Sequence, residues 1–219
     1  MELKGKKMVF LGDSITQGCG TSSIEHVYWN VIGKRTGAEV LGFGVGGTRI
    51  APQRTPTVER PWEDETFGER ADKMPADADV VVVFGGTNDF GHGDAAFGKF
   101  TDRTGDTFCG AFHLLLQKLI NKYPAAKIVV MTPTHRLSED EDVYNELGVR
   151  RMGKLVRYVD AEKEIAGFYG LPCVDLFREC PMQPKMEVMR QRFMPDGLHP
   201  NDAGNELIAN CLLKVLQEL

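Results

Sequence analysis

Residues 12–16, Gly-Asp-Ser-Ile-Thr, place a serine directly after an apolar run near the amino end of the chain. A tight turn after a buried strand requires the small Gly12, and it would leave the hydroxyl of Ser14 exposed at the mouth of a sheet. The N–H groups that follow, at or near a helix start, can face developing negative charge. This chemistry would make Ser14 a nucleophile. Ser or Asp after a strand also often caps a helix, so a structural role for the turn is open as well.

Two further stretches offer hydrogen-bond donors. The sequence GVGGTR at 44–49 contains Gly46 and Gly47, which reach backbone conformations closed to other residues and let a substrate approach the main chain. The sequence FGGTNDFG at 84–91 places Asn88 after two glycines. A neutral asparagine amide with two donor hydrogens can hold an oxyanion. Taken alone, the first stretch also fits a plain Gly-rich turn and the second an Asx turn.

A fourth stretch, MPDGLHPNDAG at 194–204, supplies a base and its partner. Asp196 and His199 are three residues apart, so the carboxylate can reach the imidazole from the same loop. It would then fix the tautomer and stabilise the imidazolium that forms when histidine takes a proton. The alternative is that Asp196 or Asn201-Asp202 caps the final helix and His199 is an exposed loop residue. Together the four stretches predict a nucleophile, two oxyanion donors, an orienting acid and a base.

The elements that would position these residues alternate between strands and helices. Two of the five apolar runs are nearly continuous Val, Ile and Met, which is typical of strands buried on both faces of a parallel sheet. The expected strands are 7–11, 39–44, 79–85, 127–132 and 172–176, and the expected helices are 24–35, 108–123, 154–170 and 202–219. Ser22-Ser23 can cap the first helix, Gly37 can end it, and Asp106 can cap the second. This order predicts right-handed crossovers and one three-layer α/β domain over residues 1–219.

Long stretches without a clear pattern connect these elements, at 48–78, 86–105, 133–150 and 177–201. Most of them leave the carboxyl end of an expected strand. Ligand sites in open parallel sheets form outside those ends. The stretches are therefore placed where function is expected, although loops of this length also occur as simple insertions.

The composition narrows the function classes. The 219 residues carry a net charge of -5, which argues against a nucleic-acid partner because phosphate binding requires a basic face. The apolar stretch at the amino end is far shorter than a signal-peptide core, so we expect no targeting segment and no membrane span. An odd count of five scattered cysteines favours a reducing, cytoplasmic compartment. No two histidines stand at metal-ligand spacing, so we expect no metal; structural or surface roles are expected for His26, His92, His113 and His135.

At its four motifs the sequence resembles the SGNH hydrolases, also called the GDSL esterase/lipase family. The matching blocks, in the family's order, are GDSIT with Ser14, GVGGTR with Gly47, GGTND with Asn88, and DGLHP with Asp196 and His199. In the family pattern a polar pair follows the donor glycine, which points to Gly47 rather than Gly46. One position departs from the pattern, because the family often has an asparagine where this chain has Gly42. That departure puts the support of the oxyanion loop in doubt.

The resemblance implies a flavodoxin-like α/β/α sandwich with five parallel strands in the order 2-1-3-4-5. It also implies a serine esterase that acts on a small-molecule ester through a Ser14-His199-Asp196 triad, without a metal or an organic cofactor. Its oxyanion hole would consist of the N–H groups of Ser14 and Gly47 and the side chain of Asn88.

The substrate is predicted less sharply than the chemistry. Side chains after the strand ends that could line the pocket are Asp13, Arg49, Phe90 and His135, with Arg136 beside them. We expect short acyl groups, including acetyl groups on carbohydrates. A thioesterase or lysophospholipase of the same mechanism is the alternative. A carbohydrate-binding module with an inactive site is less favoured, because the serine, asparagine, aspartate and histidine are all present.

Overall fold

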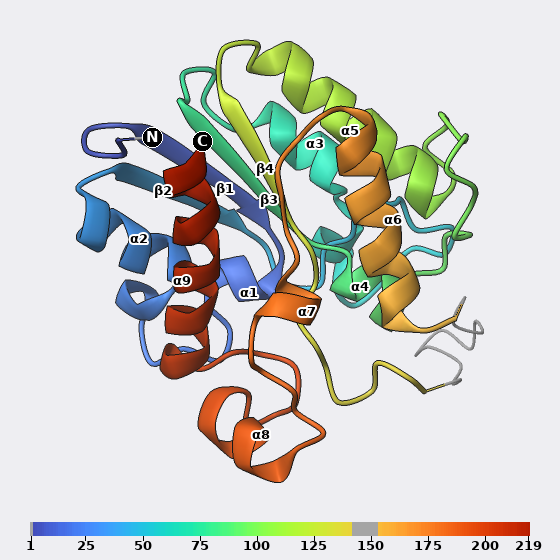
Figure 1. Cartoon of the computed structure of the whole chain (residues 1–219). Helices are drawn as coiled ribbons and strands as arrows, with labels where there is room; N and C mark the ends of the chain where they lie inside the picture. Colours follow the sequence, from blue (N-terminus) through green and yellow to red (C-terminus); the bar gives the residue numbers. More distant parts are fainter. Residues whose placement is uncertain (1, 142–152) are drawn as a thin grey trace.

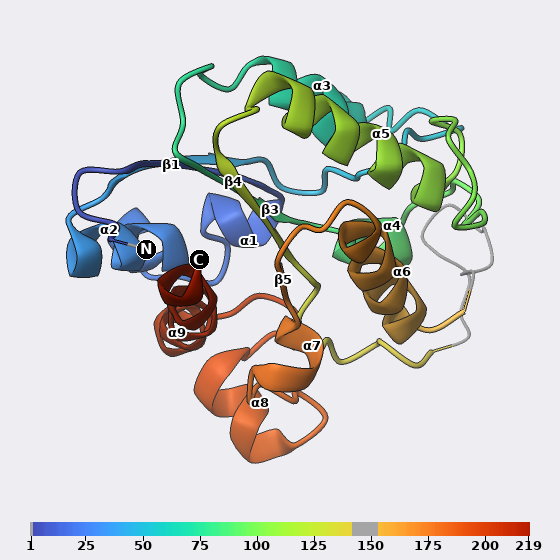
Figure 2. The same cartoon turned by 45° about the horizontal axis from the view of Figure 1, so that its top comes forward.

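The computed structural model describes residues 2–141 and 153–219. Within these ranges the centre of the molecule is a sheet of five parallel strands in the order β2-β1-β3-β4-β5. Figure 1 labels the first four of these strands and Figure 2 labels β5. The strands are β1 (Lys7–Gly12), β2 (Glu39–Gly44), β3 (Val80–Phe84), β4 (Lys127–Met131) and β5 (Cys173–Val174). The predicted fold class, strand number and strand order are confirmed.

The register of the sheet brings the ends of four strands together. Gly12 of β1 pairs with Gly44 of β2 on one side and with Phe84 of β3 on the other. Phe84 in turn pairs with Met131 of β4. Because these residues close their strands, the four segments that follow begin side by side at one edge of the sheet.

Helices cover both faces of the sheet, as Figures 1 and 2 show. On one face lie α2 (Tyr28–Thr36) and α9 (Asp202–Glu218), and on the other lie α3 (Phe67–Asp72), α5 (Phe108–Lys122) and α6 (Leu155–Phe168). Alternate residues of β1 face the two layers: Met8 and Phe10 pack toward α2 and α9, while Val9 and Leu11 pack toward α3, α5 and α6. Burial on both faces explains why the strands read as continuous apolar runs.

The predicted helix 24–35 is divided into a short 3-10 helix, η1 (Ile24–His26), and α2. Ser23 stands at the N-cap position of η1, within the predicted Ser22-Ser23 pair, but its side chain makes no capping hydrogen bond. Ser22 instead donates from its N–H and its hydroxyl to the carboxylate of Asp202, at 2.8 and 2.6 Å. Asp202 is the first residue of α9, so these bonds join the segment before η1 to the last helix.

The ends of two helices test the expected caps. Gly37 follows α2 with a φ of 72°, a left-handed conformation, and so ends that helix as predicted. The prediction of Asp106 as the cap of α5 is wrong by one residue. The hydroxyl of Thr107 accepts the N–H of Gly110 at 3.1 Å and caps the helix.

Several short helices lie in stretches that the sequence left without a pattern. They are η2 (Pro61–Asp64), α3, α4 (Thr87–Gly91) and α8 (Glu187–Phe193). Two more short helices, α1 (Ser14–Gln17) and α7 (Leu176–Glu179), follow β1 and β5, and α1 lies where a helix start was expected. The start of α3 is a capping box, in which Thr66 and Glu69 exchange side-chain to backbone hydrogen bonds. Of the stretch 133–150, positions 142–150 lie outside the described residues. Among the helices of the described ranges, none has the length and apolar character needed to cross a bilayer.

Candidate active site

Ser14 is the first residue of α1, and only Asp13 separates it from the end of β1. Asp13 caps this one-turn helix by accepting the N–H of Ile15 at 3.0 Å. A Cβ atom on Gly12 would lie 1.9 Å from the hydroxyl of Thr16, so only glycine lets the chain turn this tightly from strand to helix. The turn leaves Ser14 with 7% of its surface exposed, at the carboxyl edge of the sheet.

A chain of hydrogen bonds runs from Ser14 to the carboxyl-terminal loop. The hydroxyl of Ser14 lies 3.0 Å from Nε2 of His199, although the two residues are 185 positions apart. Nδ1 of His199 lies 2.7 Å from Oδ2 of Asp196. The other carboxylate oxygen, Oδ1, accepts the N–H groups of Leu198 at 2.9 Å and His199 at 2.7 Å. The carboxylate is thereby oriented by its own loop.

Two carboxyl groups beside this chain have shifted pKa values. Burial raises the pKa of Asp13 to about 6, although the hydrogen bond from Ile15 acts in the opposite direction. Burial also raises the pKa of Asp196, but the hydrogen bonds from the backbone and ring of His199 outweigh it and hold the pKa below its ordinary value. Asp196 therefore stays a carboxylate at neutral pH, which suits an acceptor of the imidazole proton.

The second and third motifs converge on the same edge. Gly47 has a φ of 78°, and a Cβ atom there would lie 2.3 Å from Cδ of Glu63, so both conformation and space require glycine. A Cβ atom on Gly46 would lie 3.6 Å from Cβ of Ser14, which places this loop directly against the serine. The N–H of Gly46 already donates to the side chain of Gln17 at 2.7 Å.

Asn88 lies on α4, which follows β3, and is buried. Its amide nitrogen donates to the carbonyl oxygen of Thr48 at 3.0 Å. This bond fixes the side chain and joins the segment after β3 to the loop after β2. The nitrogen carries a second hydrogen, so an amide held in this way can donate to a ligand as well.

The comparisons with known proteins identify the family of the chain. The model of the GDSL-like lipase/acylhydrolase family matches residues 10–207. The chain belongs to this family. As a GDSL-like acylhydrolase it is a carboxylic ester hydrolase. No match to a curated protein was found.

Solved structures similar to this GDSL hydrolase extend over its whole length. One is 31% identical with a TM-score of 0.84, covering 100% of this chain and 99% of that one. A protein from Lactobacillus plantarum is 28% identical with a TM-score of 0.81 and 98% coverage of both chains. A two-domain esterase active on acetylated mannans shares the fold at 22% identity and a TM-score of 0.58, over 99% of this chain and 50% of its own.

Three of the residues predicted to contact substrate are buried in the protein. Arg49 is 2% exposed, and its guanidinium binds Nδ1 of His92 at 2.8 Å and the carboxylate of Asp64 at 2.7 Å. Phe90 is buried and packs edge-on against the ring of Tyr158. Asp13, the third, is buried as the cap of α1. Each of the three residues therefore has a structural role in this GDSL hydrolase. Contact of these residues with a substrate stays a prediction.

His135, the fourth predicted substrate residue, lies after β4 and is partly exposed. Its Nδ1 lies 2.8 Å from the carboxylate of Glu139, and its ring packs 3.9 Å from the centre of Phe177. Gln183 donates to Glu139 at 3.2 Å. His135 and Glu139 lie on the segment after β4, and Gln183, which lies between α7 and α8, completes a polar cluster with them. Contact of His135 with a substrate also stays a prediction.

Sequence reasoning missed Leu137, which lies on this same segment. Its N–H donates to the carbonyl oxygen of Gly197 at 2.7 Å, within the loop that carries Asp196 and His199. The side chain of Leu137 is 41% exposed. A hydrophobic residue in a polar loop gave no signal by itself, because only the fold brings it against residue 197.

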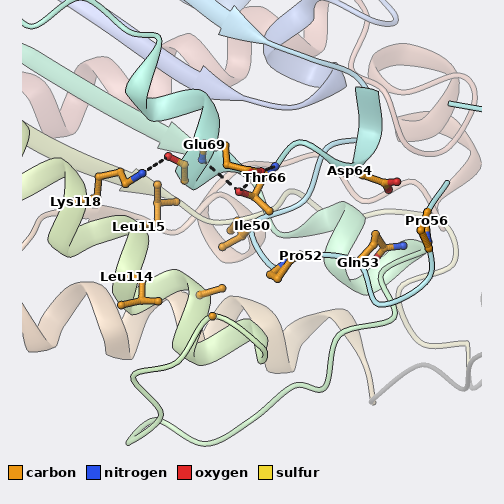
Figure 3. A pocket seen from close by; sticks show the side chains of 13 residues that line it. Ile50, Pro52, Gln53, Pro56, Asp64, Thr66, Glu69, Leu114, Leu115 and Lys118 are labelled. Carbon is orange, nitrogen blue, oxygen red and sulfur yellow. Dashed lines mark hydrogen bonds between the residues drawn. The ribbon is translucent and has the colours of Figure 1, made fainter. Parts of the chain in front are cut away.

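A separate cavity of about 480 Å³ lies between α5 and the segment after β2. Figure 3 shows the side chains that line it. Its apolar wall includes Ile50, Pro52, Leu114 and Leu115, and Lys118 lies at its side. None of the motif residues lines it. Among residues 2–141 and 153–219, no three His, Cys, Asp or Glu side chains group closely enough to hold a metal ion.

Proposed function

We propose that this GDSL hydrolase cleaves short-chain carboxylic esters with Ser14 as the nucleophile, His199 as the general base and Asp196 as the residue that orients the base. The observation that carries the proposal is the unbroken hydrogen-bond chain from the Ser14 hydroxyl through both ring nitrogens of His199 to Asp196. A serine hydroxyl is a weak nucleophile until an adjacent base takes its proton. The distance of 3.0 Å is within reach for that transfer.

In the first half-reaction His199 takes the proton of Ser14 as the serine oxygen attacks the ester carbonyl. The carbonyl oxygen becomes an oxyanion, and His199 then gives its proton to the leaving alcohol. An acyl group remains on Ser14. In the second half-reaction water attacks the acyl group, His199 takes a proton from that water, and Ser14 recovers its hydrogen as the acid leaves.

The oxyanion would be held by the N–H groups of Ser14 and Gly47 and by the amide of Asn88. The bond of the Gly46 N–H to Gln17 supports Gly47 rather than Gly46 as the loop donor. Donors that are aimed before the reaction cost no reorganisation when charge develops. Three such donors suit a tetrahedral intermediate of acyl transfer.

We further propose small acyl groups, including acetyl on a carbohydrate, as the substrate class. The polar cluster of His135, Glu139 and Gln183 supports a leaving group rich in hydroxyls, because Leu137, two residues after His135, is bonded to Gly197 in the loop that carries Asp196 and His199. The fold shared with an esterase active on acetylated mannans is in keeping with this class. A thioesterase or a lysophospholipase with the same mechanism is the competing assignment.

A fluorophosphonate probe and a panel of nitrophenyl esters of rising chain length test the proposal. We expect the probe to label Ser14, and Ser14→Ala to remove labelling and lower kcat by about a millionfold, because nucleophile and base act as a unit. Ser23→Ala, an exposed serine, is the matched control and keeps full activity. Retained activity in Ser14→Ala would exclude Ser14 as the nucleophile. The absence of labelling in the wild-type protein would favour a binding module.

A further inference from the structure

We call residues 43–48 the oxyanion loop. They comprise the last two residues of β2 and the turn that follows, which contains Gly47 and ends at Thr48, the residue bonded to Asn88. No side chain of β2 can brace it from position 42. A Cβ atom on Gly42 would lie 2.5 Å from the indole of Trp29, which fills this space. The indole N–H donates instead to the carbonyl oxygen of Thr16, at 2.9 Å. The support of the oxyanion loop must therefore come from elsewhere in the fold.

Arg70 of α3 reaches both ends of the oxyanion loop. Its Nη1 donates to the hydroxyl of Thr48 at 2.8 Å, and its Nη2 donates to the carbonyl oxygen of Phe43. The Thr48 hydroxyl in turn donates to the carbonyl oxygen of Val45 at 2.7 Å. One guanidinium thus ties the first, third and last residues of the loop to each other.

The environment of Arg70 holds this guanidinium in place. The residue is 4% exposed, and its guanidinium lies 5.2 Å from the centre of the Phe67 ring. Burial lowers the pKa of Arg70 to about 10, opposed by the negative charge of Asp13. The guanidinium is therefore charged at neutral pH, and a planar fork with fixed donor directions suits two acceptors at once.

Thr48 is held from two sides, by Arg70 at its hydroxyl and by Asn88 at its carbonyl oxygen. Gly47 is its neighbour in the chain. Movement of Thr48 would shift the N–H of Gly47 and release the contact that fixes the Asn88 amide. Two of the three proposed oxyanion donors therefore depend on the same anchored residue.

We propose that Arg70 is a positioning residue, which fixes the oxyanion loop so that Gly47 and Asn88 donate to the oxyanion; this rests on the ester hydrolysis proposed above. Arg70 acts through the loop and touches neither Ser14 nor His199 in the contacts described. The proposal also gives the long segment after β2 a function, because this segment folds back as α3 and returns Arg70 to the sheet edge.

The test compares Arg70→Met, Arg70→Lys and the matched control Arg35→Met on a nitrophenyl acetate ester. Arg35 is a surface arginine of α2 that binds Glu206 and Asn210. We expect Arg70→Met to lower kcat by about ten- to a hundredfold with KM within about twofold, because misplaced donors weaken the transition state. Lysine can reach one acceptor at a time, so Arg70→Lys should fall between wild type and Arg70→Met. The control should match the wild type.

A boronic acid that forms a tetrahedral adduct with Ser14 separates positioning from general destabilisation. Its affinity should fall in Arg70→Met by the same factor as kcat/KM, since both depend on the oxyanion donors. Unchanged kcat, or a fall in kcat with unchanged boronate affinity in folded protein, would overturn the proposal. Fluorophosphonate labelling of the wild-type Ser14 is measured alongside. Its absence would count against the ester hydrolysis itself, whereas normal labelling with an unaffected Arg70→Met would count against Arg70 alone.

Thr48→Val provides the second variant if Arg70→Met does not fold. It removes the acceptor of Nη1 and should lower kcat and boronate affinity together, by about tenfold. In the double variant with Arg70→Lys the losses should be less than multiplicative, because the two residues act through one contact. Wild-type kcat in Thr48→Val, or fully multiplicative losses, would contradict the role of Arg70.

Discussion

The two sides of the candidate site differ in how they are held. On the donor side, Ser14 and Asn88 are 7% and 5% exposed, and Thr48 and Arg70 are buried beneath them. On the base side, the side chain of His199 is 24% exposed and that of Asp196 is 54% exposed. The donor side is built into the interior at the sheet edge, whereas the base side stands on a surface loop.

This difference follows from what each side must do. Oxyanion donors are effective because they point at the position of the oxyanion before the reaction begins and because the site excludes water. The base gains and loses a proton in each half-reaction, and burying the resulting ion pair would add a desolvation cost. We therefore expect substitutions on the base side to lower the rate with little change in stability, and substitutions on the donor side to lower both.

The largest effect that separates the two sides is expected from Asp196→Asn. Its amide can present a hydrogen to Nδ1 of His199, which favours the wrong tautomer, so kcat should fall by roughly a thousand- to ten-thousandfold. The lowered pKa means that the carboxylate stabilises the fold above its unfolded pKa and that this contribution is lost as the pH falls. Because the group is more than half exposed, the free energy of unfolding at pH 7 should change by no more than about 1 kcal/mol. Urea denaturation and ester kinetics measure both quantities.

A large loss of stability in Asp196→Asn would show that the base side contributes to the fold as much as the donor side does, which contradicts the difference drawn above. Asp202→Asn is a matched control. Asp202 binds Ser22 at a similarly exposed position but has no contact with His199 among those described. We expect it to keep the wild-type kcat.

Asn88→Ala should have a smaller effect on rate and a larger one on stability. Loss of one oxyanion donor lowers kcat by about a hundred- to a thousandfold. The carbonyl oxygen of Thr48 loses its donor in a buried setting, so the free energy of unfolding should fall by about 1–3 kcal/mol. The enzyme should still label at Ser14, only more slowly.

Asn210→Ala is the surface counterpart, because Asn210 binds the exposed Arg35. It should change stability by no more than about 0.5 kcal/mol. If Asn88→Ala is as stable as this control while kcat falls, the amide serves chemistry alone and the donor side is less integrated than its burial suggests.

The sequence was most informative where a local pattern has one physical cause. The run Val80–Phe84 is buried throughout, and such burial leaves an uninterrupted apolar signature. The spacing of Asp196 and His199 likewise predicted contact within one loop, which the structure has. The contact between Ser14 and His199 followed from placing both at ends of the α/β elements rather than from either residue alone.

The segment after β2 was beyond local prediction. A helix as short as α3 has too few turns to show a period, although its capping box was readable at Thr66 and Glu69. Arg49 was predicted to line the substrate pocket, and its ion pair with Asp64, fifteen residues further along, was not foreseen. Such a pairing depends on how the segment folds back, and neither partner signals it in the sequence.

Glu162 of α6 has a buried carboxyl group near the donor side, and it has no role in the proposed reaction. It is 1% exposed, and its Oε1 makes no hydrogen bond in the described part of the chain. A Cβ atom on Gly86 would lie 2.0 Å from this oxygen, which places the carboxyl group against the turn that precedes Asn88. Burial, together with the nearby negative charges of Asp89 and Asp13, raises the pKa of Glu162 well above its ordinary value.

The smallest effect on rate is therefore expected from Glu162→Gln, with a gain in stability. A carboxyl group whose pKa is raised in the folded state destabilises the fold as the pH rises above its unfolded pKa, because ionisation becomes more costly in the protein than in water. The two proteins should have similar stability near pH 4, and above that pH the wild type should lose stability relative to the variant. By pH 8 we expect the variant to be the more stable protein, with kcat within about twofold of the wild type. Urea denaturation across this range measures the difference, and a variant that is less stable at pH 8 would mean that the carboxylate is stabilised by its surroundings and that the interior near Asn88 tolerates charge.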